Sequence, residues 1–382
     1  MFLSRIQGKI NASTLAQKRI AMENTHTHTH TEQQSRQRIL IVGNLGYIGP
    51  VLTNHFKSVE PNSKLMGLDT GYFSGCLIDP YNSVDQQLNE QIYADVRQID
   101  SVDLPEADTV IYLAAISNDP MGNVYEKPTS EINHKAAVNL AKIYKSRGAK
   151  SFVFASSCSV YGAGGDSAKK EDDSLNPLTA YARSKIGAEI ELETLGSENF
   201  SITCLRFATA CGASPRLRLD LVLNDFVASA LLKKEIEILS DGMPWRPLID
   251  VEDMCKAIVW AKDRHTDQYF LALNVGFESW NYRIKDLAVA VSKNLKGVEV
   301  RVNPNAAPDK RSYRVDFSLY KKLAPLNQNS KSLDTTIEEL IDNIRSSTFR
   351  ADDFRKSHLI RLNTLKNLRE RERIDASLYW KL

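Results

Sequence analysis

Tyr181 and Lys185 stand four residues apart in the stretch AYARSK, a spacing that suits acid–base chemistry. On a helix, side chains at this spacing project from the same face, so the lysine ammonium can stabilise a phenolate beside it. We therefore expect the pKa of Tyr181 to fall from about 10 toward neutrality, which would make the phenol usable as a general acid or base. The spacing alone proves little, because a chain with 14 tyrosines can produce it by chance.

Ser157 offers a hydroxyl to the same chemistry. It follows the apolar run of FVFASSCSVYG, which places Ser156 and Ser157 at the carboxyl end of a predicted strand, where parallel sheets bind their ligands. A serine there can hydrogen-bond both the phenol and a substrate hydroxyl, aligning a C–O–H group for proton removal while hydride leaves the carbon for a nicotinamide. Small residues after a strand are also common turn formers, so this interpretation needs a dinucleotide site elsewhere in the chain.

A glycine-rich loop in ILIVGNLGYIGPVL could provide that site. Gly43 allows a tight turn, Gly46 allows backbone amides to approach a pyrophosphate, and Gly49 allows the following helix to pack closely on the sheet. Pro50 suits the first turn of that helix, whose amino terminus then faces the phosphates. Three glycines could also mark nothing more than a tight loop.

Asp69 strengthens the prediction of a dinucleotide site. It ends the apolar stretch KLMGLD, where a carboxylate accepts hydrogen bonds from the adenosine ribose hydroxyls and repels a 2′-phosphate, which favours NAD over NADP. Asp95 and Val96, in ADVR, could flank the adenine, although ordinary turn residues would look the same. Only the ordered set of glycine loop, Asp69, Ser157, Tyr181 and Lys185 supports catalysis with NAD.

A parallel sheet is needed to hold these residues in place. Apolar runs predict buried strands at 39–42, 65–68, 109–115, 151–155 and 202–207. Helical periodicity appears between them, at 131–147 and 180–195. This alternation predicts an α/β fold, a Rossmann-like doubly wound parallel sheet over residues 38–207, to which some later segments could return.

The rest of the chain divides into three parts. We expect residues 208–348 to form a smaller mixed α/β substrate-binding lobe. Its expected helices lie at 221–234, 251–262, 281–295 and 335–346, and a strand is expected at 237–239. Residues 349–382 predict a C-terminal helical tail. Residues 1–37 are polar and predict a disordered leader, although a targeting presequence is possible. Within this leader His26, His28 and His30 could bind metal as a cluster, but a low-complexity tail fits better, and we predict no metal site.

Composition excludes several classes of function. The 49 basic and 47 acidic residues give a net charge of +2, so no bulk field draws the chain to nucleic acid or to a membrane surface, and we expect neither as a partner. No apolar run reaches the roughly 18 residues of a membrane helix. Five scattered cysteines suggest reduced thiols and a cytoplasmic location.

The motifs together resemble the extended short-chain dehydrogenase/reductase family, specifically its NAD-dependent nucleotide-sugar epimerases and dehydratases. The similarity runs from about residue 38 to 344, through GNLGYIG, YLAA, INHKAAVNL, SSCSVYG, YARSK, WRPLIDVEDMCKAI and LNVG in the family's order. It implies tightly bound NAD, with Tyr181 as acid/base, Lys185 on the nicotinamide ribose and Ser157 as the third catalytic hydroxyl. It also implies a homodimer, because helices equivalent to those bearing Tyr181 and residues 131–147 commonly pair across subunits. The residues expected at the cofactor are Gly43, Gly46, Tyr47, Ile48, Gly49, Asp69, Asp95, Val96, Leu113, Ala114, Ala115, Tyr181 and Lys185.

For the substrate, the resemblance implies a nucleotide-diphosphate sugar. Arg246 matches an arginine that usually meets phosphate, and its planar guanidinium suits a diphosphate. A surface or ion-pair role is equally possible for Arg246 and for two further arginines considered for this site, Arg216 and Arg218. Asp119, in AAISNDPMGN, could supply an extra acid, or its loop could be an ordinary turn. The other substrate candidates are Ser117 and Asn118 in that loop, Thr209, Arg216, Arg218 and Tyr313.

Two departures from the family bear on the reaction. Family 4,6-dehydratases usually place an Asp-Glu pair directly after the catalytic hydroxyl, whereas this chain has Cys158 and Ser159. Epimerases that use carbanion chemistry generally have a cysteine two positions after the serine, where this chain has Ser159, so Cys158 is interpreted as pocket lining or core. Thr209 replaces a frequent asparagine.

The preferred hypothesis is an NAD-dependent nucleotide-sugar epimerase that oxidises the sugar transiently and returns the hydride to the other face. A ketoreductase, dehydrogenase or dehydratase for the same substrates is the nearest alternative. A non-catalytic dinucleotide-binding regulator is an alternative from another class, although such a sensor has no use for an activated phenol.

Overall fold

The computed structural model describes residues 36–80, 87–163, 167–264, 268–303, 312–328, 331–350 and 353–381. Nearly all of the predicted leader, including His26, His28 and His30, lies outside these residues. By contacts, Gln37–Leu382 forms one compact unit. No helix within the described ranges is both long and apolar enough to cross a membrane.

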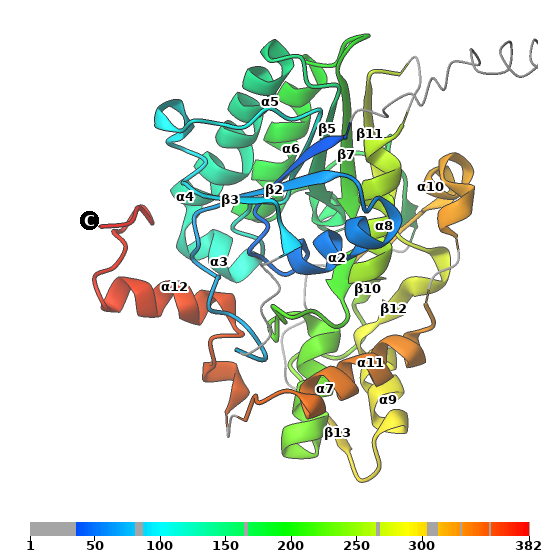
Figure 1. The fold of residues 1–382 in the computed structure, drawn as a ribbon. Helices are drawn as coiled ribbons and strands as arrows, with labels where there is room; N and C mark the ends of the chain where they lie inside the picture. The colour runs from blue at the N-terminus through cyan, green and yellow to red at the C-terminus, as the bar shows by residue number, and fades with distance from the viewer. Residues whose placement is uncertain are drawn as a thin grey trace, which may run out of the picture. The chain divides into compact units, whose positions relative to one another are not determined.

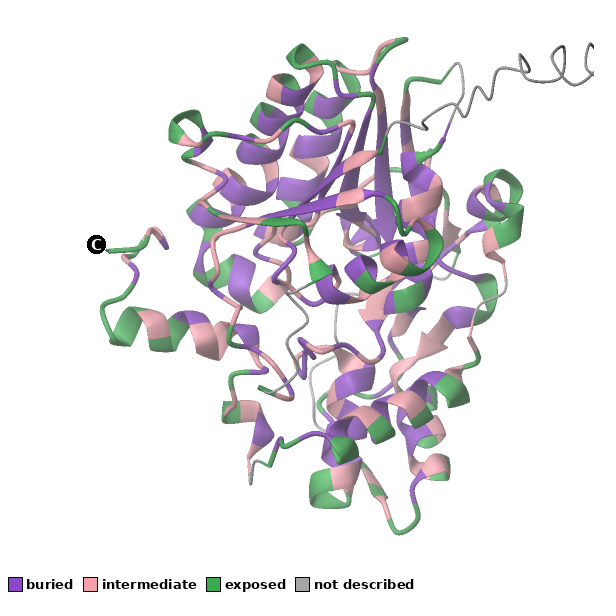
Figure 2. Cartoon of the chain, in the orientation of Figure 1, coloured by how far each residue is buried: buried purple, intermediate pink, exposed green. Residues whose placement is uncertain are grey.

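A seven-stranded sheet forms the centre of the larger unit, and every neighbouring pair of its strands is parallel (Figure 1). Across the sheet the strands are β11 (Phe270–Val275), β7 (Ser201–Phe207), β5 (Ser151–Ser157), β4 (Thr109–Tyr112), β1 (Arg38–Val42), β2 (Lys64–Asp69) and β3 (Glu90–Tyr93). Most central strands are buried along their length, as Figure 2 shows in purple, because helices cover both faces. The Rossmann-like α/β fold expected from the sequence is confirmed.

Alternate residues along the central strands point to opposite faces of the sheet and pack into two separate hydrophobic clusters. On β1, Ile39 and Ile41 join one hydrophobic cluster, and Leu40 and Val42 join the other, as the two-residue period of a strand requires. The first cluster includes residues of α2 (Gly49–Val59) and α8 (Val251–Lys262). The second includes residues of α5 (Ala137–Ser146) and α6 (Ala180–Glu193).

Several predicted boundaries were wrong. The strand expected at 109–115 ends at Tyr112, and the helix expected at 281–295 begins only at Ile284, because Asn281–Arg283 pair with a neighbouring strand as β12. ADVR follows a strand-like segment in the sequence, and this segment forms β3, which is only partly buried. One strand of the sheet was not predicted: β11 returns to the sheet from beyond residue 207.

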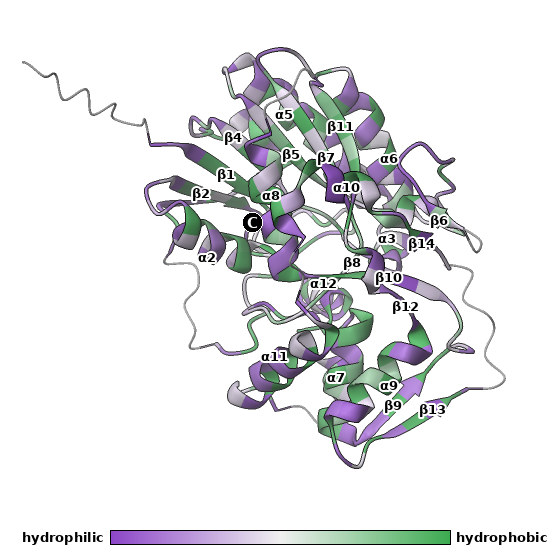
Figure 3. Ribbon diagram, turned by 90° about the vertical axis from the view of Figure 1, so that its right-hand side faces the viewer, coloured by the Kyte–Doolittle hydropathy of each residue, from purple (hydrophilic) through white to green (hydrophobic). Residues whose placement is uncertain are grey.

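The smaller lobe is built from short sheets and helices and lies below the central sheet in Figure 3. Its strands are β8 (Thr209–Cys211), β10 (Trp245–Asp250) and β12 in one sheet, and β9 (Glu235–Ile238) with β13 (Glu299–Val302) in another. Its helices are α7 (Val222–Lys233), α9 (Ile284–Asn294) and α11 (Leu333–Ser346). The remaining short elements are η2 (Ile99–Ser101), α3 (Asp119–Val124), α4 (Glu126–Ser130), η3 (Glu131–Ala136), η4 (Cys158–Tyr161), β6 (Ala168–Lys169), η5 (Glu278–Trp280), β14 (Arg314–Val315), α10 (Ser318–Leu323) and η6 (Pro325–Asn327).

The C-terminal segment, residues 353–381, is only partly the helical tail that the sequence predicted. It contains η7 (Phe354–Lys356) and α12 (Arg361–Glu370), and the chain then turns back so that Ile374 pairs with Trp380. Leu365, Ile374 and Leu378 are buried in the second hydrophobic cluster of the sheet. The segment is therefore packed into the core.

Candidate active site

A cavity of about 1200 Å³ opens where the central strands end and the smaller lobe begins. The carboxyl ends of β1, β2, β4 and β5 deliver loops to it, as expected for a parallel sheet. The predicted site residues that line it are Gly43, Gly46, Tyr47, Ile48, Asp69, Asp95, Val96, Leu113, Ala114, Ala115, Ser117, Asn118, Ser157, Tyr181, Lys185, Thr209, Arg246 and Tyr313. Gly49 and Arg216 are not among the lining residues.

The glycine loop has the close contacts that a dinucleotide cradle needs. Gly43 has a φ of +85°, and a Cβ on it would lie 2.5 Å from the backbone nitrogen of Ala114. A Cβ on Gly49 would lie 1.9 Å from the carbonyl oxygen of Asn44, so the start of α2 packs tightly on the loop. The N-cap residue of α2, Ile48, has no side-chain oxygen to cap the helix. Gly46 and the amino end of α2 therefore fit a diphosphate group.

The carboxylate of Asp69 is held at the end of β2. Its Oδ1 accepts from the backbone N–H of Gly71 at 2.7 Å, and its Oδ2 accepts from that of Leu45 at 3.0 Å. These two bonds fix the carboxylate in the cavity wall, and a carboxylate can accept hydrogen bonds from ribose hydroxyls. The placement fits NAD.

Asp95 has a structural role in addition to its place in the cavity wall. Its carboxylate pairs with Arg97, at 2.6 Å from Nη2, and the Arg97 guanidinium lies 3.7 Å from the centre of the Tyr379 ring. The backbone N–H of Arg97 also donates to Asp95, so the turn that the sequence left open is present.

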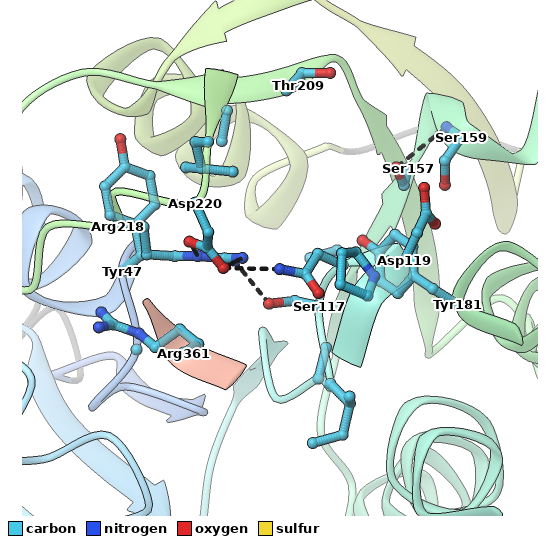
Figure 4. A pocket seen from close by; sticks show the side chains of 18 of the residues that line it. Tyr47, Ser117, Asp119, Ser157, Ser159, Tyr181, Thr209, Arg218, Asp220 and Arg361 are labelled. Carbon is cyan, nitrogen blue, oxygen red and sulfur yellow. Dashed lines mark hydrogen bonds and ion pairs between the residues drawn. The ribbon is translucent and has the colours of Figure 1, made fainter. Parts of the chain in front are cut away.

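The three predicted catalytic side chains all line the cavity, and Figure 4 shows Ser157 and Tyr181 on the same side of it. Ser157 is the last residue of β5, and its Oγ accepts from the backbone N–H of Ser159 at 3.2 Å. Thr179 caps α6, which carries Tyr181 and Lys185 on one face. The Nζ of Lys185 donates to the carbonyl of Ala155 at 2.6 Å and lies 5.6 Å from the centre of the Tyr181 ring.

The pKa expected for Tyr181 was wrong for this structure. Burial raises the pKa of Tyr181 to about 12, although the Ser157 hydroxyl and the charge of Arg218 act to lower it. Burial likewise lowers the pKa of Lys185 to about 7. The motif showed which groups are neighbours, whereas the sequence did not show how strongly burial acts on the pKa of each.

A buried polar network lies opposite the catalytic wall. Arg218 pairs with Asp220 through Nε and Oδ1 at 2.9 Å and donates from Nη1 to Ser117 at 2.8 Å. Asn118, the N-cap of α3, donates to the Oδ2 of Asp220 at 2.7 Å. Sequence reasoning had not singled out Asp220, although its spacing from Arg218 by two residues in RLRLD suggested a shared face of an extended segment.

Arg246 and Tyr313 form another part of the wall, from the smaller lobe. The guanidinium of Arg246 lies 5.8 Å from the centre of the Tyr313 ring. Thr209, on β8, also lines the cavity. Arg216 is fully buried beside the cavity and donates from Nη2 to the carbonyl of Ser74 at 3.2 Å. Its place indicates support of the cavity wall.

Cys158 belongs to the hydrophobic core, which was one of the two positions expected for it; the other was the pocket lining. Its thiol is buried and donates to the carbonyl of Arg206 at 3.0 Å, and burial raises its pKa well above the usual range. Ser159 lines the cavity, and its buried Oγ has no hydrogen-bond partner among the described residues.

The fold and this site place the chain among known proteins. The NAD dependent epimerase/dehydratase family matches residues 39–276. An uncharacterized UDP-glucose epimerase, YtcB of Bacillus subtilis strain 168, is 29% identical over 230 residues, which cover 58% of this chain and 71% of that protein.

Two solved structures share the fold. TunA, an NAD dependent-NDP-hexosamine 5,6-dehydratase of tunicamycin biosynthesis, superposes with a TM-score of 0.71 at 21% identity, over 83% of this chain and 100% of its own. MoeE5, in complex with UDP-glucose and NAD, does so with a TM-score of 0.68 at 23% identity, over 81% of this chain and 99% of its own.

Proposed function

This chain belongs to the NAD dependent epimerase/dehydratase family, whose members are NAD-dependent enzymes that act on nucleotide sugars, and we propose which reaction it catalyses. The proposed reaction is the epimerisation of a nucleotide-diphosphate sugar by transient oxidation to a keto sugar. The catalytic residues are Ser157, Tyr181 and Lys185. The observation that carries this proposal is that these three side chains meet in one cavity with a dinucleotide cradle.

The chain's own residues provide the cofactor contacts. Gly46 and the amino end of α2 would accept the diphosphate, Asp69 the adenosine ribose, and Lys185 the nicotinamide ribose. Bound NAD would accept hydride from a sugar carbon and later return it.

Tyr181 handles the proton in this scheme. Its phenolate takes the proton of the sugar hydroxyl as the carbonyl forms, and the phenol gives the proton back when the carbonyl is reduced, so the proton count closes. Ser157 lines the same cavity as Tyr181, and its hydroxyl can bond the same sugar oxygen. Burial disfavours ionisation of the Tyr181 phenol, whereas the positive charge of Arg218 favours it.

The residues after Ser157 favour epimerisation over elimination. Cys158 points into the core and Ser159 is a neutral hydroxyl, so neither provides a carboxylate next to Ser157. Arg246, beside Tyr313, is proposed to bind the substrate diphosphate.

A dehydratase is the second candidate, and Asp119 is the observation that favours it. Asp119 lines the cavity, and its charge raises the pKa of both Tyr181 and Tyr313. A carboxylate in that place could assist elimination of water from the sugar.

Product analysis distinguishes these reactions. The purified protein is analysed for bound NAD and incubated with UDP-, dTDP-, GDP- and CDP-sugars, and the products are followed by NMR. An epimerised sugar without net NADH formation supports the proposal, a dehydrated keto sugar shows the dehydratase, and stoichiometric NADH shows a dehydrogenase. Bound NAD without turnover of any sugar would contradict catalysis and support a regulator.

We also propose that the enzyme is a cytoplasmic homodimer. All five cysteines are buried and free, which suits a reducing compartment. On α6, which would pair across subunits, Ile190 is 62% exposed, a large apolar side chain that a partner could cover. Light scattering of the purified chain checks the mass, and a monomer would contradict this assembly.

A further inference from the structure

The C-terminal segment bridges the two lobes beside the cavity. The indole of Trp380 donates to the carbonyl of Thr70, at the end of β2, at 2.8 Å. Arg355 pairs with Asp225 of α7 at 2.9 Å. The backbone N–H of Leu219 donates to the carbonyl of Leu359 at 3.1 Å. These contacts bring Ile360 and Arg361 into the cavity wall.

Arg361 is buried there with an incomplete set of partners. It is 2% exposed, its Nη2 donates to the carbonyl of Arg216 at 2.7 Å, and its guanidinium lies 5.4 Å from the Phe73 ring centre. Its Nη1 is also buried, and among the described residues it has no hydrogen-bond partner. A buried guanidinium without an anion is costly, so the geometry calls for a negative group at this place.

The surroundings of Arg361 add positive charge. Burial lowers the pKa of Arg361, and the charges of Arg218 and Arg216 lower it further, whereas Cys76 and Asp220 act in the opposite direction. Arg218 already pairs with Asp220, so that carboxylate is shared. Arg361 also begins α12, a ten-residue helix whose N-cap residue, Ile360, offers no side-chain oxygen to its first N–H groups.

The position of Arg361 within the cavity indicates which part of a ligand it would contact. In Figure 4, Arg361 and Arg218 lie on the side of the pocket where Tyr47 is drawn, away from Tyr181 and Ser157. Tyr47 follows Gly46 in the glycine loop, the predicted phosphate-binding part of the site. A nucleotide that reaches from this loop to the catalytic wall carries its diphosphate between its two ends.

We propose that Arg361, delivered by the C-terminal segment, binds the diphosphate group of a nucleotide held in this cavity. The planar guanidinium can donate two parallel hydrogen bonds to phosphate oxygens, and its Nη1 has no hydrogen-bond partner among the described residues. NAD and a nucleotide-diphosphate sugar share this chemistry, and for the second of these ligands the inference rests on the proposed function.

Binding measurements on the full-length protein test Arg361 without reference to turnover. Arg361→Met and Arg361→Lys are compared with the parent and with Lys366→Met, which removes one charge from an exposed position of the same helix. The readouts are the NAD content of the purified protein, the dissociation constant of NADH and that of each of UDP, dTDP, CDP and GDP. Melting temperature and protease sensitivity of the C-terminal segment are recorded for each variant.

We expect Arg361→Met to weaken one class of ligand by about 10- to 100-fold, Arg361→Lys to recover part of it, and Lys366→Met to stay within about twofold. A loss confined to NADH assigns Arg361 to the cofactor diphosphate, and a loss confined to a nucleoside diphosphate assigns it to the substrate. If every affinity of Arg361→Met stays within about twofold, the proposal is wrong. It is equally wrong if both Arg361 variants lose all ligands alike while the C-terminal segment becomes protease-sensitive, since Arg361 then only anchors that segment.

Because NADH affinity does not require a turning-over enzyme, failure of these measurements is distinct from failure of the proposed function.

Discussion

At the scale of single residues, Tyr181 and Lys185 are governed by burial as much as by each other. Both side chains end at the cavity wall, and burial disfavours the charged form of each. The catalytic pair therefore depends on what the packed chain places around it, including Arg218 and the carbonyl of Ala155.

Replacing Tyr181 by Phe removes the proposed acid/base while keeping the aromatic ring. We expect turnover to fall by about 10²- to 10⁴-fold, the usual contribution of proton transfer, with an unchanged circular dichroism spectrum. Tyr269→Phe, at a partly exposed tyrosine that does not line the cavity, is the matched control. Turnover of Tyr181→Phe at the parent rate would remove Tyr181 from the mechanism.

Lys185 gives a pH dependence whose sign can be worked out. Its pKa is about 7 in the folded chain and about 10.5 when exposed, so between these values the unfolded state binds more protons. The free energy of unfolding of the NAD-free protein should therefore rise with pH from about 7 to 10, relative to Lys185→Met. Urea unfolding across this range measures the difference. Lys135→Met, at an exposed lysine, should keep the slope of the parent, and parallel curves for the parent and Lys185→Met would contradict the prediction.

At the scale of elements, the glycine loop is a packing contact between β1, α2 and the loop after β4. Gly49→Ala would bring a Cβ within 1.9 Å of the Asn44 carbonyl oxygen, so α2 must move. We expect a loss of roughly 1–3 kcal/mol in stability and weaker NADH binding. Chemical denaturation and NADH titration measure both.

Gly75→Ala is the control for this substitution. A Cβ at Gly75, which is exposed, meets no described atom within 4 Å, so stability should change by less than about 0.5 kcal/mol. Equal effects of the two substitutions would show that close packing of Gly49 is unimportant.

The catalytic helix α6 is also fixed at element scale. Arg206 of β7 pairs with Glu189 of α6 at 2.7 Å, and both side chains are buried. Ser156, at the end of β5, donates to the same carboxylate. This network holds α6 against the strand that ends in Ser157.

At the scale of the whole molecule, residues of the sheet, the smaller lobe and the C-terminal segment share one cavity. A ligand bound there should stabilise all three together. With NADH at about 100 times its dissociation constant, the gain is about 2.7 kcal/mol, and we expect one thermal transition that moves upward as a unit. Calorimetry checks this, and two transitions of which only one moves would show that the lobes unfold independently.

How much of this was visible in the sequence depended on the range of the interaction. The apolar runs of β1, β2, β5 and β7 predicted the strands, because buried parallel strands are recognisable from local composition. The sequence showed β3 only as a strand-like segment before ADVR, without bounds, since its residues are only partly buried. β11 was missed as a sheet strand, because the regular alternation of strands and helices is lost after about residue 207.

Local patterns in the sequence were enough to identify the family, the parallel sheet, the glycine loop and the residues proposed for catalysis, because glycine spacing, strand ends and the Tyr181–Lys185 spacing involve residues close together in the chain. Three features depend on the tertiary structure: the pKa values of Tyr181 and Lys185, the position of Arg216 outside the cavity lining, and the position of Arg361 in it. Arg361 contacts Arg216, which lies 145 residues earlier in the chain. Burial and long-range contact are properties of the packed chain. They depend on how distant segments cover one another, and no short stretch of residues encodes that covering.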